Sequence, residues 1–264
     1  DLSVLSKLPK EVAEAFKGAE RPAIIMGGAA LAKGALGAGL AFAETYGLAK
    51  DGWNGFNVLH FSAARMGGLM LGYAQKGGMK DIAAAKPKVV ISLGADEMDF
   101  EPFADSLKVY IGHHGDKGAQ LADIILPGAA YTEKDATFVN TEGRVQTTRT
   151  SVTPPGEARV DWEIVRALSA LTETPLPYDT LAAVRARLAQ VSPHFALYDT
   201  LQPANFFKVA AQHASGSKAP ANFALEVAQK ALKDFYMTDP ISRASLTMAK
   251  CVKATQRVDA DKNF

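Results

Sequence analysis

Residues 122–146 read ADIILPGAAYTEKDATFVNTEGRVQ, and the interpretation of the whole chain starts from this stretch. It opens with a short apolar run, Asp123–Leu126, which is predicted to be a strand that a Pro-Gly dipeptide stops. A second extended run, Thr137–Val139, leads into the polar turn Asn140–Arg144. The sequence therefore predicts two strands joined through a charged corner.

The polar corner carries side chains that can bind a ligand or fasten one part of the protein to another. They are Asn140, Glu142, Arg144 and Gln146. Asn140 and Gly143 tolerate the positive φ that tight turns need. Several backbone N–H groups stay free in such a turn, which suits a polar ligand with many acceptors. Composition alone favours a structural corner whose polar groups satisfy one another.

Apolar runs at intervals along the chain predict a parallel sheet. Ala23–Met26 is one run, Lys88–Leu93 is the clearest, and Leu107–Ile111 is the next. Together with Asp123–Leu126, they alternate with helical or loop segments. This βαβ pattern is typical of a parallel sheet covered on both faces. We therefore expect an α/β protein with a Rossmann-like region over residues 1–155.

Helical periodicity marks the segments around and after this sheet. In the first region it predicts helices at 9–18, from Gly28 to about Tyr46 and at 62–75, with a strand or helix start at 57–61. Helices dominate the C-terminal region, 156–254. They are predicted to begin near Asp161, near Asp179 or Thr180, near Asn222, and near Thr238 or Asp239. Residues 255–264 are polar and are predicted to be a frayed tail.

The composition is that of an ordinary globular protein and excludes several classes. Among 264 residues, 29 basic and 28 acidic side chains give a net charge of +1, which offers no basic surface for nucleic acid. No apolar stretch reaches the roughly 20 residues of a membrane helix. The sequence begins Asp1-Leu2-Ser3, so we expect either a removed presequence or a part of a longer protein.

Cys251 is the one cysteine of the sequence. A disulfide within the chain is therefore impossible, and so is an iron–sulfur cluster held by this chain alone, because such clusters generally need four ligands. Cys251 falls on the apolar stripe of the last predicted helix. We expect it to act there as a small apolar side chain.

Motifs for nucleotide or metal binding are incomplete. Gly27-Gly28 follows a strand, but its spacing fits neither a dinucleotide fingerprint nor a phosphate loop, since Lys33 precedes Gly34. His113 and His114 are neighbours on an extended chain and are predicted to point to opposite faces, with no further metal ligand nearby.

Signals for catalysis are equally weak. No G-x-S-x-G elbow is present, and the pairs Asp96/Glu97 and Glu133/Asp135 are predicted to be solvated corners. We expect no catalytic residue and no metal ligand. One place for a ligand remains, the crevice at the carboxyl ends of the strands near Gly94, Gly112 and His113, because open α/β sheets bind ligands there.

The stretch 122–146 resembles the signature of the molybdopterin oxidoreductase superfamily, which includes formate dehydrogenases and dimethyl sulfoxide reductase. Further segments resemble one branch, the large iron–sulfur subunit of respiratory complex I (NADH:ubiquinone oxidoreductase). They read GHHGD at 112–116, VTPPG at 152–156, LPYDTL at 176–181 and DFYMTDPISRAS at 234–245. The similarity spans residues 88–252 and is looser over 1–87.

The resemblance implies a Rossmann-like sheet region of that superfamily followed by a helical C-terminal region. It implies a non-catalytic structural part of the iron–sulfur subunit in the peripheral, NADH-oxidising arm, which supports electron transfer from NADH to ubiquinone. No cofactor is expected in this chain, and the iron–sulfur clusters are expected in the rest of the subunit or in a partner chain. The expected partners are other peripheral-arm subunits, with no nucleic acid and no direct membrane span.

The resemblance also implies an origin for the polar corner and a cellular location for the chain. In active enzymes of the superfamily the matching region approaches the pterin, so Asn140, Glu142, Arg144 and Gln146 form a degenerate pterin-site corner. The expected location is the matrix side of the mitochondrial inner membrane, or the cytoplasmic face in a bacterium. The alternative is an independent molybdopterin- or nucleotide-binding oxidoreductase domain. The sequence leaves open whether the chain is a truncated fragment or the product of a split gene.

Overall fold

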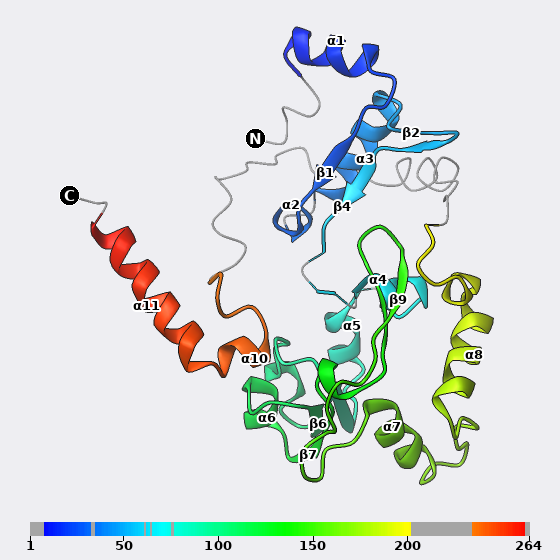
Figure 1. Cartoon of the computed structure of the whole chain (residues 1–264), viewed down its shortest axis with the longest axis vertical. Coiled ribbons are helices and arrows are strands. Elements are labelled where there is room, and N and C mark those ends of the chain that lie inside the picture. The colour runs from blue at the N-terminus through cyan, green and yellow to red at the C-terminus, as the bar shows by residue number, and fades with distance from the viewer. Residues whose placement is uncertain are drawn as a thin grey trace. The chain divides into compact units, whose positions relative to one another are not determined.

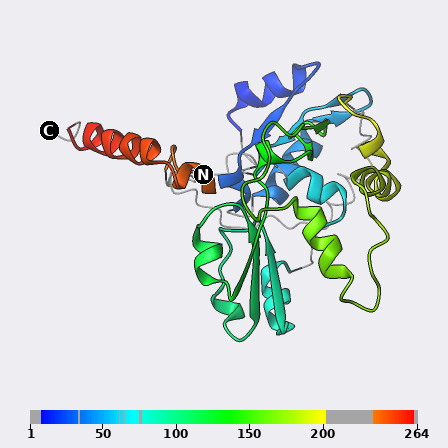
Figure 2. The same cartoon turned by 60° about the horizontal axis from the view of Figure 1, so that its bottom comes forward.

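The computed structural model of the chain describes residues 8–32, 35–60, 62–63, 65–74, 77–201 and 234–261 (Figures 1 and 2). Contacts divide it into two compact units. The first comprises Asp1–Gly67, Val139–Arg144 and Asp199–Ala231, and the second comprises Gly68–Phe138, Val145–Tyr198 and Leu232–Phe264. The boundary at residue 155, suggested by the change from strands to helices, stays a prediction. The helix expected near Asn222 lies outside the described residues.

The first unit is built on a short parallel pair of strands, β1 (Ile24–Met26) and β4 (Phe56–Val58). Helices α2 (Gly28–Ala32) and α3 (Leu36–Thr45) follow β1, and α1 (Lys10–Gly18) precedes it. The buried cluster of this unit includes Met26, Phe42 and Phe56. Phe16 of α1 contacts Phe42 edge-on, with ring centroids 5.1 Å apart.

Gly39 lets α3 approach β1 closely. A Cβ at this position would lie 2.2 Å from the sulfur of Met26, so a larger residue would have to displace the Met26 side chain. The unit also contains the antiparallel pair β2 (Ala49–Lys50) and β3 (Trp53–Asn54). Helix α4 (Arg65–Met70) begins within it.

The second unit contains a three-stranded parallel sheet in the order β5-β6-β7. The strands are β5 (Val89–Leu93), β6 (Leu107–Gly112) and β7 (Ile124–Pro127), and they run side by side in Figure 2. Helix α5 (Met79–Ala84) precedes β5, a 3-10 turn η2 (Glu101–Phe103) leads to β6, and α6 (Lys117–Leu121) leads to β7. The parallel α/β class predicted from the sequence is thereby confirmed.

A hairpin and, within the residues that the structure describes, four helices follow this sheet. After the 3-10 turn η3 (Tyr131–Glu133), β8 (Thr137–Val139) pairs with β9 (Val145–Thr147) around the polar turn. The helices are α7 (Asp161–Ser169), α8 (Leu181–Val191), α10 (Pro240–Arg243) and α11 (Leu246–Asp261), with a 3-10 turn η4 (Pro193–Ala196) after α8. Among the helices described, none combines the length and the apolar character that a membrane crossing requires.

The sequence predicts buried strands, and this prediction is wrong for the strands at the edges of the sheets, β5 and β1. The central strand β6 is buried, whereas Ile91 of β5 is 54% exposed and Ile25 of β1 is also exposed. The sequence predicts one sheet covered on both faces, but the described strands form separate parallel sheets. The physical reason is that the side chains of a strand point at the faces of its sheet, and the described elements leave the face with Val89, Ile91 and Leu93 largely uncovered.

Several predicted helices differ in their ends. The Ala-rich helix expected up to Tyr46 is divided into α2 and α3, and the helix expected after Asp239 is divided into α10 and α11. Thr180 caps α8 as predicted, because its hydroxyl accepts from Ala183 N at 3.1 Å. Asp161 does not cap α7, because it is already the first helical residue and its carboxylate binds Lys134 instead. Helix α11 continues to Asp261, past the start of the predicted tail.

Candidate functional site

A buried hydrogen bond lies at the carboxyl end of the three-stranded sheet. The Tyr110 hydroxyl donates to Asp96 Oδ1 at 2.6 Å, and the two residues are 2% and 5% exposed. Burial, and then this hydrogen bond, raise the pKa of Tyr110 well above its ordinary value. The hydroxyl therefore remains a donor at neutral pH. The expectation of a solvated corner at Asp96 and Glu97 is wrong for Asp96, because the turn after β5 directs its side chain at Tyr110.

Two glycines make room for this tyrosine. A Cβ on Gly112 would lie 2.1 Å from the Tyr110 hydroxyl oxygen, and one on Gly118 would lie 2.7 Å from the Tyr110 ring. Gly118 belongs to α6, so its missing side chain lets α6 pack directly on the ring. The positions therefore require glycine because of close approach.

A guanidinium from the C-terminal segment binds the loops at this end of the sheet. Arg243 Nε lies 2.7 Å from Asp116 Oδ2, and Arg243 Nη1 lies 2.9 Å from Glu97 Oε1. The Asp116 side chain is 21% exposed and that of Glu97 is 71% exposed, so the pair with Asp116 contributes more to stability. These bonds attach α10 to the loops that follow β5 and β6.

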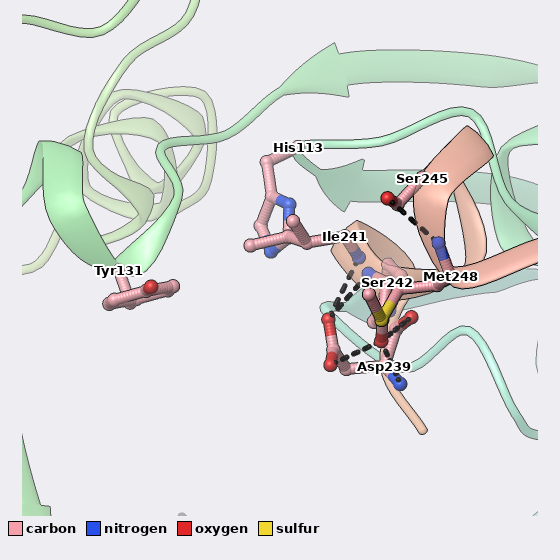
Figure 3. Close-up of a pocket in the computed structure, with 8 residues that line it drawn as sticks. His113, Tyr131, Asp239, Ile241, Ser242, Ser245 and Met248 are labelled. Atoms are coloured by element: carbon pink, nitrogen blue, oxygen red, sulfur yellow. Dashed lines mark hydrogen bonds between the residues drawn. The ribbon is translucent and has the colours of Figure 1, made fainter. Parts of the chain in front are cut away.

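A cleft of about 460 Å³ separates the end of β6 from α10 and the start of α11. Its lining includes His113, Tyr131, Asp239, Ile241, Ser242 and Met248 (Figure 3). Asp239 caps α10 by accepting from the backbone N–H groups of Ile241 and Ser242, and the Ser242 hydroxyl donates to Asp239 Oδ2 at 2.6 Å. The carboxylate and this hydroxyl are therefore engaged within the helix start and are not directed at a ligand. Asp239 is one of the two caps predicted for this helix.

The two histidines beside the cleft, His113 and His114, contact each other. His113 Nδ1 lies 2.7 Å from His114 Nδ1, and the rings meet edge to face. The expectation that these neighbours point to opposite faces is therefore wrong, because the chain turns directly after β6. Burial lowers the pKa of His113, and the nearby charges of His114 and Lys134 lower it further. One of the two nitrogens must donate and the other accept, so the ring that accepts carries no proton on that nitrogen.

The polar corner is a turn that satisfies its own donors. Asn140 Oδ1 accepts from the backbone N–H groups of Glu142 and Arg144, both at 3.0 Å. Arg144 Nε lies 3.8 Å from Glu142 Oε2, and Arg144 Nη1 donates to the backbone oxygen of Asp199. Gly143 has a φ of +86°, as the predicted tight turn requires. Asn140, Glu142 and Arg144 are thus brought together, whereas Gln146 lies exposed on β9.

The other acidic pair predicted to be a solvated corner is tied to the backbone. Glu133 Oε2 accepts from Ala130 N at 2.9 Å. Asp135 Oδ1 accepts from the backbone N–H and from the hydroxyl of Thr150, and these bonds lower the pKa of Asp135. Neither carboxylate is arranged as part of an acid–base dyad. Both fasten the segment between β7 and β8.

A molybdopterin cofactor, which the fold family implies, does not fit the residues of this corner. It would need free donors for its phosphate and polar ring. The Asn140 oxygen, the Arg144 guanidinium and two backbone N–H groups are already engaged within the turn or with Asp199. Within the part of the chain that the structure describes, no group of three or more His, Cys, Asp or Glu side chains is placed to hold a metal. Cys251 is a half-buried thiol on α11.

Sequence reasoning missed Arg243. Asp116 lies 127 positions before it, so no local pattern connects the two residues. One signal was available: Arg243 follows the helix cap Asp239 by one turn, while acidic residues follow the predicted strand ends at Glu97 and Asp116. A cation on the terminal helix could have been paired with carboxylates at that edge of the sheet.

The chain belongs to the molybdopterin oxidoreductase family, because the sequence model of Molybdopterin oxidoreductase matches residues 1–171. A second sequence model, which describes the C-terminal region of an NADH-ubiquinone oxidoreductase subunit, matches residues 200–251. This second match includes Asp239 and Arg243 of α10. The resemblance drawn from the sequence is confirmed by both matches.

Individual relatives make the likeness more specific. The mitochondrial 78 kDa subunit of NADH-ubiquinone oxidoreductase from Neurospora crassa is 41% identical over 275 aligned residues, which cover 100% of this chain and 36% of that protein. Its counterpart from Candida albicans is 45% identical over 203 residues, covering 76% of this chain and 28% of that protein. The mitochondrial NADH dehydrogenase [ubiquinone] iron-sulfur protein 1 of Solanum tuberosum is 39% identical over 250 residues, covering 90% of this chain and 32% of that protein. The chain therefore spans about a third of the length of these relatives.

Proposed function

We propose that this chain is a non-catalytic, structural part of the iron–sulfur subunit in the NADH-oxidising arm of respiratory complex I. In this role it supports electron transfer from NADH to ubiquinone by holding and shielding the cluster-bearing part. The relatives from Neurospora crassa and Candida albicans carry the name of an NADH-ubiquinone oxidoreductase subunit, and the one from Solanum tuberosum is named an iron-sulfur protein. Their identity of 39–45% supports the same role here.

The attachment of α10 to the end of the sheet is the observation that supports a non-catalytic role for the chain. A ligand of an open α/β sheet binds beyond the carboxyl ends of its strands. At that position Arg243 instead bridges Asp116 and Glu97. This guanidinium lies within residues 200–251, which match the C-terminal model of the NADH-ubiquinone oxidoreductase subunit. The C-terminal segment therefore occupies ligand-binding space with internal ion pairs.

Cofactors, partners and location follow from the same proposal. The single cysteine cannot supply the four ligands of an iron–sulfur cluster, so the clusters belong to the rest of the subunit or to a partner chain. The partners are other subunits of the peripheral arm, above all the cluster-bearing polypeptide. The names of the fungal and plant relatives include the mitochondrion, which supports the matrix side of the inner membrane as the location.

The alternative of an independent molybdopterin- or nucleotide-binding oxidoreductase is less well supported. The polar corner uses its donors internally, and the glycines after β1 lack the spacing of a nucleotide loop. The two fungal relatives are also named as subunits of an NADH-ubiquinone oxidoreductase.

Removal of the coding region for this chain tests the proposal. We expect the assembled complex and membrane NADH oxidation to be lost, and both to return when the chain is supplied again. Persistence of an intact, NADH-oxidising complex without this chain would refute the proposal.

A further inference from the structure

A second hollow of the second unit differs from the cleft at α10. It is a groove of about 560 Å³ between β8, α7 and α8. Its lining is mainly apolar and includes Leu93, Phe138, Trp162, Val165, Leu181 and Leu188. Charged side chains at its edge are Lys134, Asp135, Asp161, Arg166 and Arg185. A few charges around a largely apolar surface are typical of a recognition site.

All but one of these charged groups have a hydrogen-bonding partner in the protein. Lys134 forms an ion pair with Asp161, and Arg166 Nη2 lies 2.9 Å from Asp179 Oδ1. Asp135 is held by the backbone N–H and hydroxyl of Thr150. Among the described residues that line the groove, these contacts leave a single cation whose hydrogen-bonding groups are not satisfied.

That cation is Arg185, on the second turn of α8. Its Nε and Nη2 atoms are buried and have no hydrogen-bond partner among the described residues. The Asp135 carboxylate is near enough to feel the charge of Arg185, but it accepts no hydrogen bond from these two nitrogens, so the hydration that they lose on burial is not replaced. A carboxylate could accept two parallel hydrogen bonds from the two adjacent N–H groups. The groove is therefore complementary to an acidic group carried on an apolar body.

The apolar surface extends beyond the groove. Leu93 lines the groove and ends β5, and alternation along the strand places Val89 and Ile91 on the same face. Val89 and Leu93 are 49% and 51% exposed, and Ile91 is more exposed still. Exposed apolar side chains next to an apolar groove suit contact with another polypeptide. The aromatic and arginine residues in the groove are of the types enriched at the centre of protein interfaces.

We propose that this groove docks a segment of a neighbouring polypeptide of the same assembly, which inserts large apolar side chains and pairs one Asp or Glu carboxylate with Arg185. The assembly is the one given under the proposed function, and the proposal rests on it only for the identity of the neighbour. The carboxylate satisfies the buried Nε and Nη2 atoms. The apolar side chains cover Leu93, Trp162 and Leu181.

Photo-crosslinking in intact cells or organelles tests the docking directly. A benzophenone amino acid replaces Tyr178, which lines the groove, and in a second variant it replaces Ala186, an exposed residue of α8 outside the lining. We expect the position 178 probe to crosslink to one segment of another subunit, with an Asp or Glu within a few residues of the linked site. The position 186 probe should not reach that segment. A product with lipid only, a product within this chain only, or no product would overturn the proposal.

Arg185 then has its own test, with Arg187 as a matched control. Arg187 is exposed on the same helix and reaches Gln190 at 3.3 Å. We expect R185Q to reduce the crosslink from position 178 by at least about tenfold, since truncating one member of a buried, hydrogen-bonded charge pair weakens binding by at least that factor. R185K should retain part of the yield, and R187Q should retain all of it. An equal effect of R185Q and R187Q would overturn the role of Arg185.

Native electrophoresis of the same samples separates failure of the two proposals. A chain that runs in the NADH-oxidising complex but gives no crosslink to another subunit supports the proposed function and refutes the docking. A chain that crosslinks to an acidic segment of a polypeptide outside that complex refutes the proposed function and identifies a different neighbour for the groove.

Discussion

Two arginines of the second unit stand in opposite situations. Arg243 of α10 bridges Asp116 and Glu97 and attaches the C-terminal segment to the sheet, whereas Arg185 of α8 is buried at two nitrogens without a partner among the described residues. The first guanidinium completes the fold from within the chain. The second lines the groove at α7 and α8 with two nitrogens that lack a hydrogen-bond partner in the described part of the chain. Internal ion pairs hold the C-terminal segment at the end of the sheet, where a cleft of about 460 Å³ remains, whereas the groove at α7 and α8 contains buried nitrogens that another molecule can satisfy.

The largest loss of unfolding free energy is expected at the buried hydrogen bond between Tyr110 and Asp96. Tyr110→Phe removes the hydroxyl bonded to Asp96 and leaves a carboxyl group that is 5% exposed without this donor. We expect the free energy of unfolding to fall by about 2–3 kcal/mol. Urea denaturation followed by circular dichroism measures it. The control is Tyr131→Phe, whose side chain is exposed, and an equal loss in both variants would contradict the structure.

A smaller loss is expected when the attachment of α10 is removed. Arg243→Met breaks the contacts to Asp116 and Glu97, and the partial exposure of both carboxylates limits the cost to about 1–2 kcal/mol. Arg159→Met is the matched control, because that exposed guanidinium lies 3.7 Å from Glu157. Hydrogen exchange should also show faster exchange of the α10 backbone in R243M alone. Unchanged protection of the α10 backbone in R243M would contradict the claim that Arg243 attaches this helix to the sheet.

Replacement of Arg185 is expected to raise the free energy of unfolding, in contrast to replacement of Arg243. Arg185→Met removes two buried nitrogens that lack hydrogen-bond partners among the described residues and keeps much of the side-chain volume. It also gives up the attraction to the Asp135 carboxylate, so the isolated chain should gain at most about 1 kcal/mol in unfolding free energy. Arg187→Met should leave stability unchanged. The same urea titration checks both variants. If R185M destabilises the isolated chain as strongly as R243M does, Arg185 already has a partner within the chain, and the contrast fails.

The smallest effect concerns pH. Burial, together with the charges of His114 and Lys134, lowers the pKa of His113, while Asp96 and Asp161 act in the opposite direction. In the folded state His113 therefore binds its proton less readily than in the unfolded chain, whose pKa is about 6.5. Stability is then full above that value and declines as the pH falls below it. Thermal unfolding between about pH 7.5 and 5 should show this decline, and His113→Asn should weaken it.

Local sequence signals predicted the elements of the fold well. The strands at β5, β6 and β7, the hairpin around Gly143 and the caps at Thr180 and Asp239 follow from apolar runs, turn residues and capping residues. Each of these depends on residues close in sequence. The parallel α/β class followed from their order along the chain.

Features that depend on distant partners could not be predicted in the same way. The burial of Asp96 depends on Tyr110, and the role of Arg243 depends on Asp116, far earlier in the chain. The exposure of Ile91 depends on what covers that face of the sheet, which an apolar run does not specify. The unpaired state of Arg185 depends on every neighbour around α8, so a helical pattern alone gives no signal for it.

One measurement tests the central claim most directly: native electrophoresis of detergent-solubilised membranes, with mass spectrometry of the band that contains this chain. The proposed function predicts a large band that oxidises NADH and that also contains cysteine-rich iron–sulfur peptides, whether from the same polypeptide or from a separate one. A chain found soluble and alone, above all with a bound pterin, would contradict it.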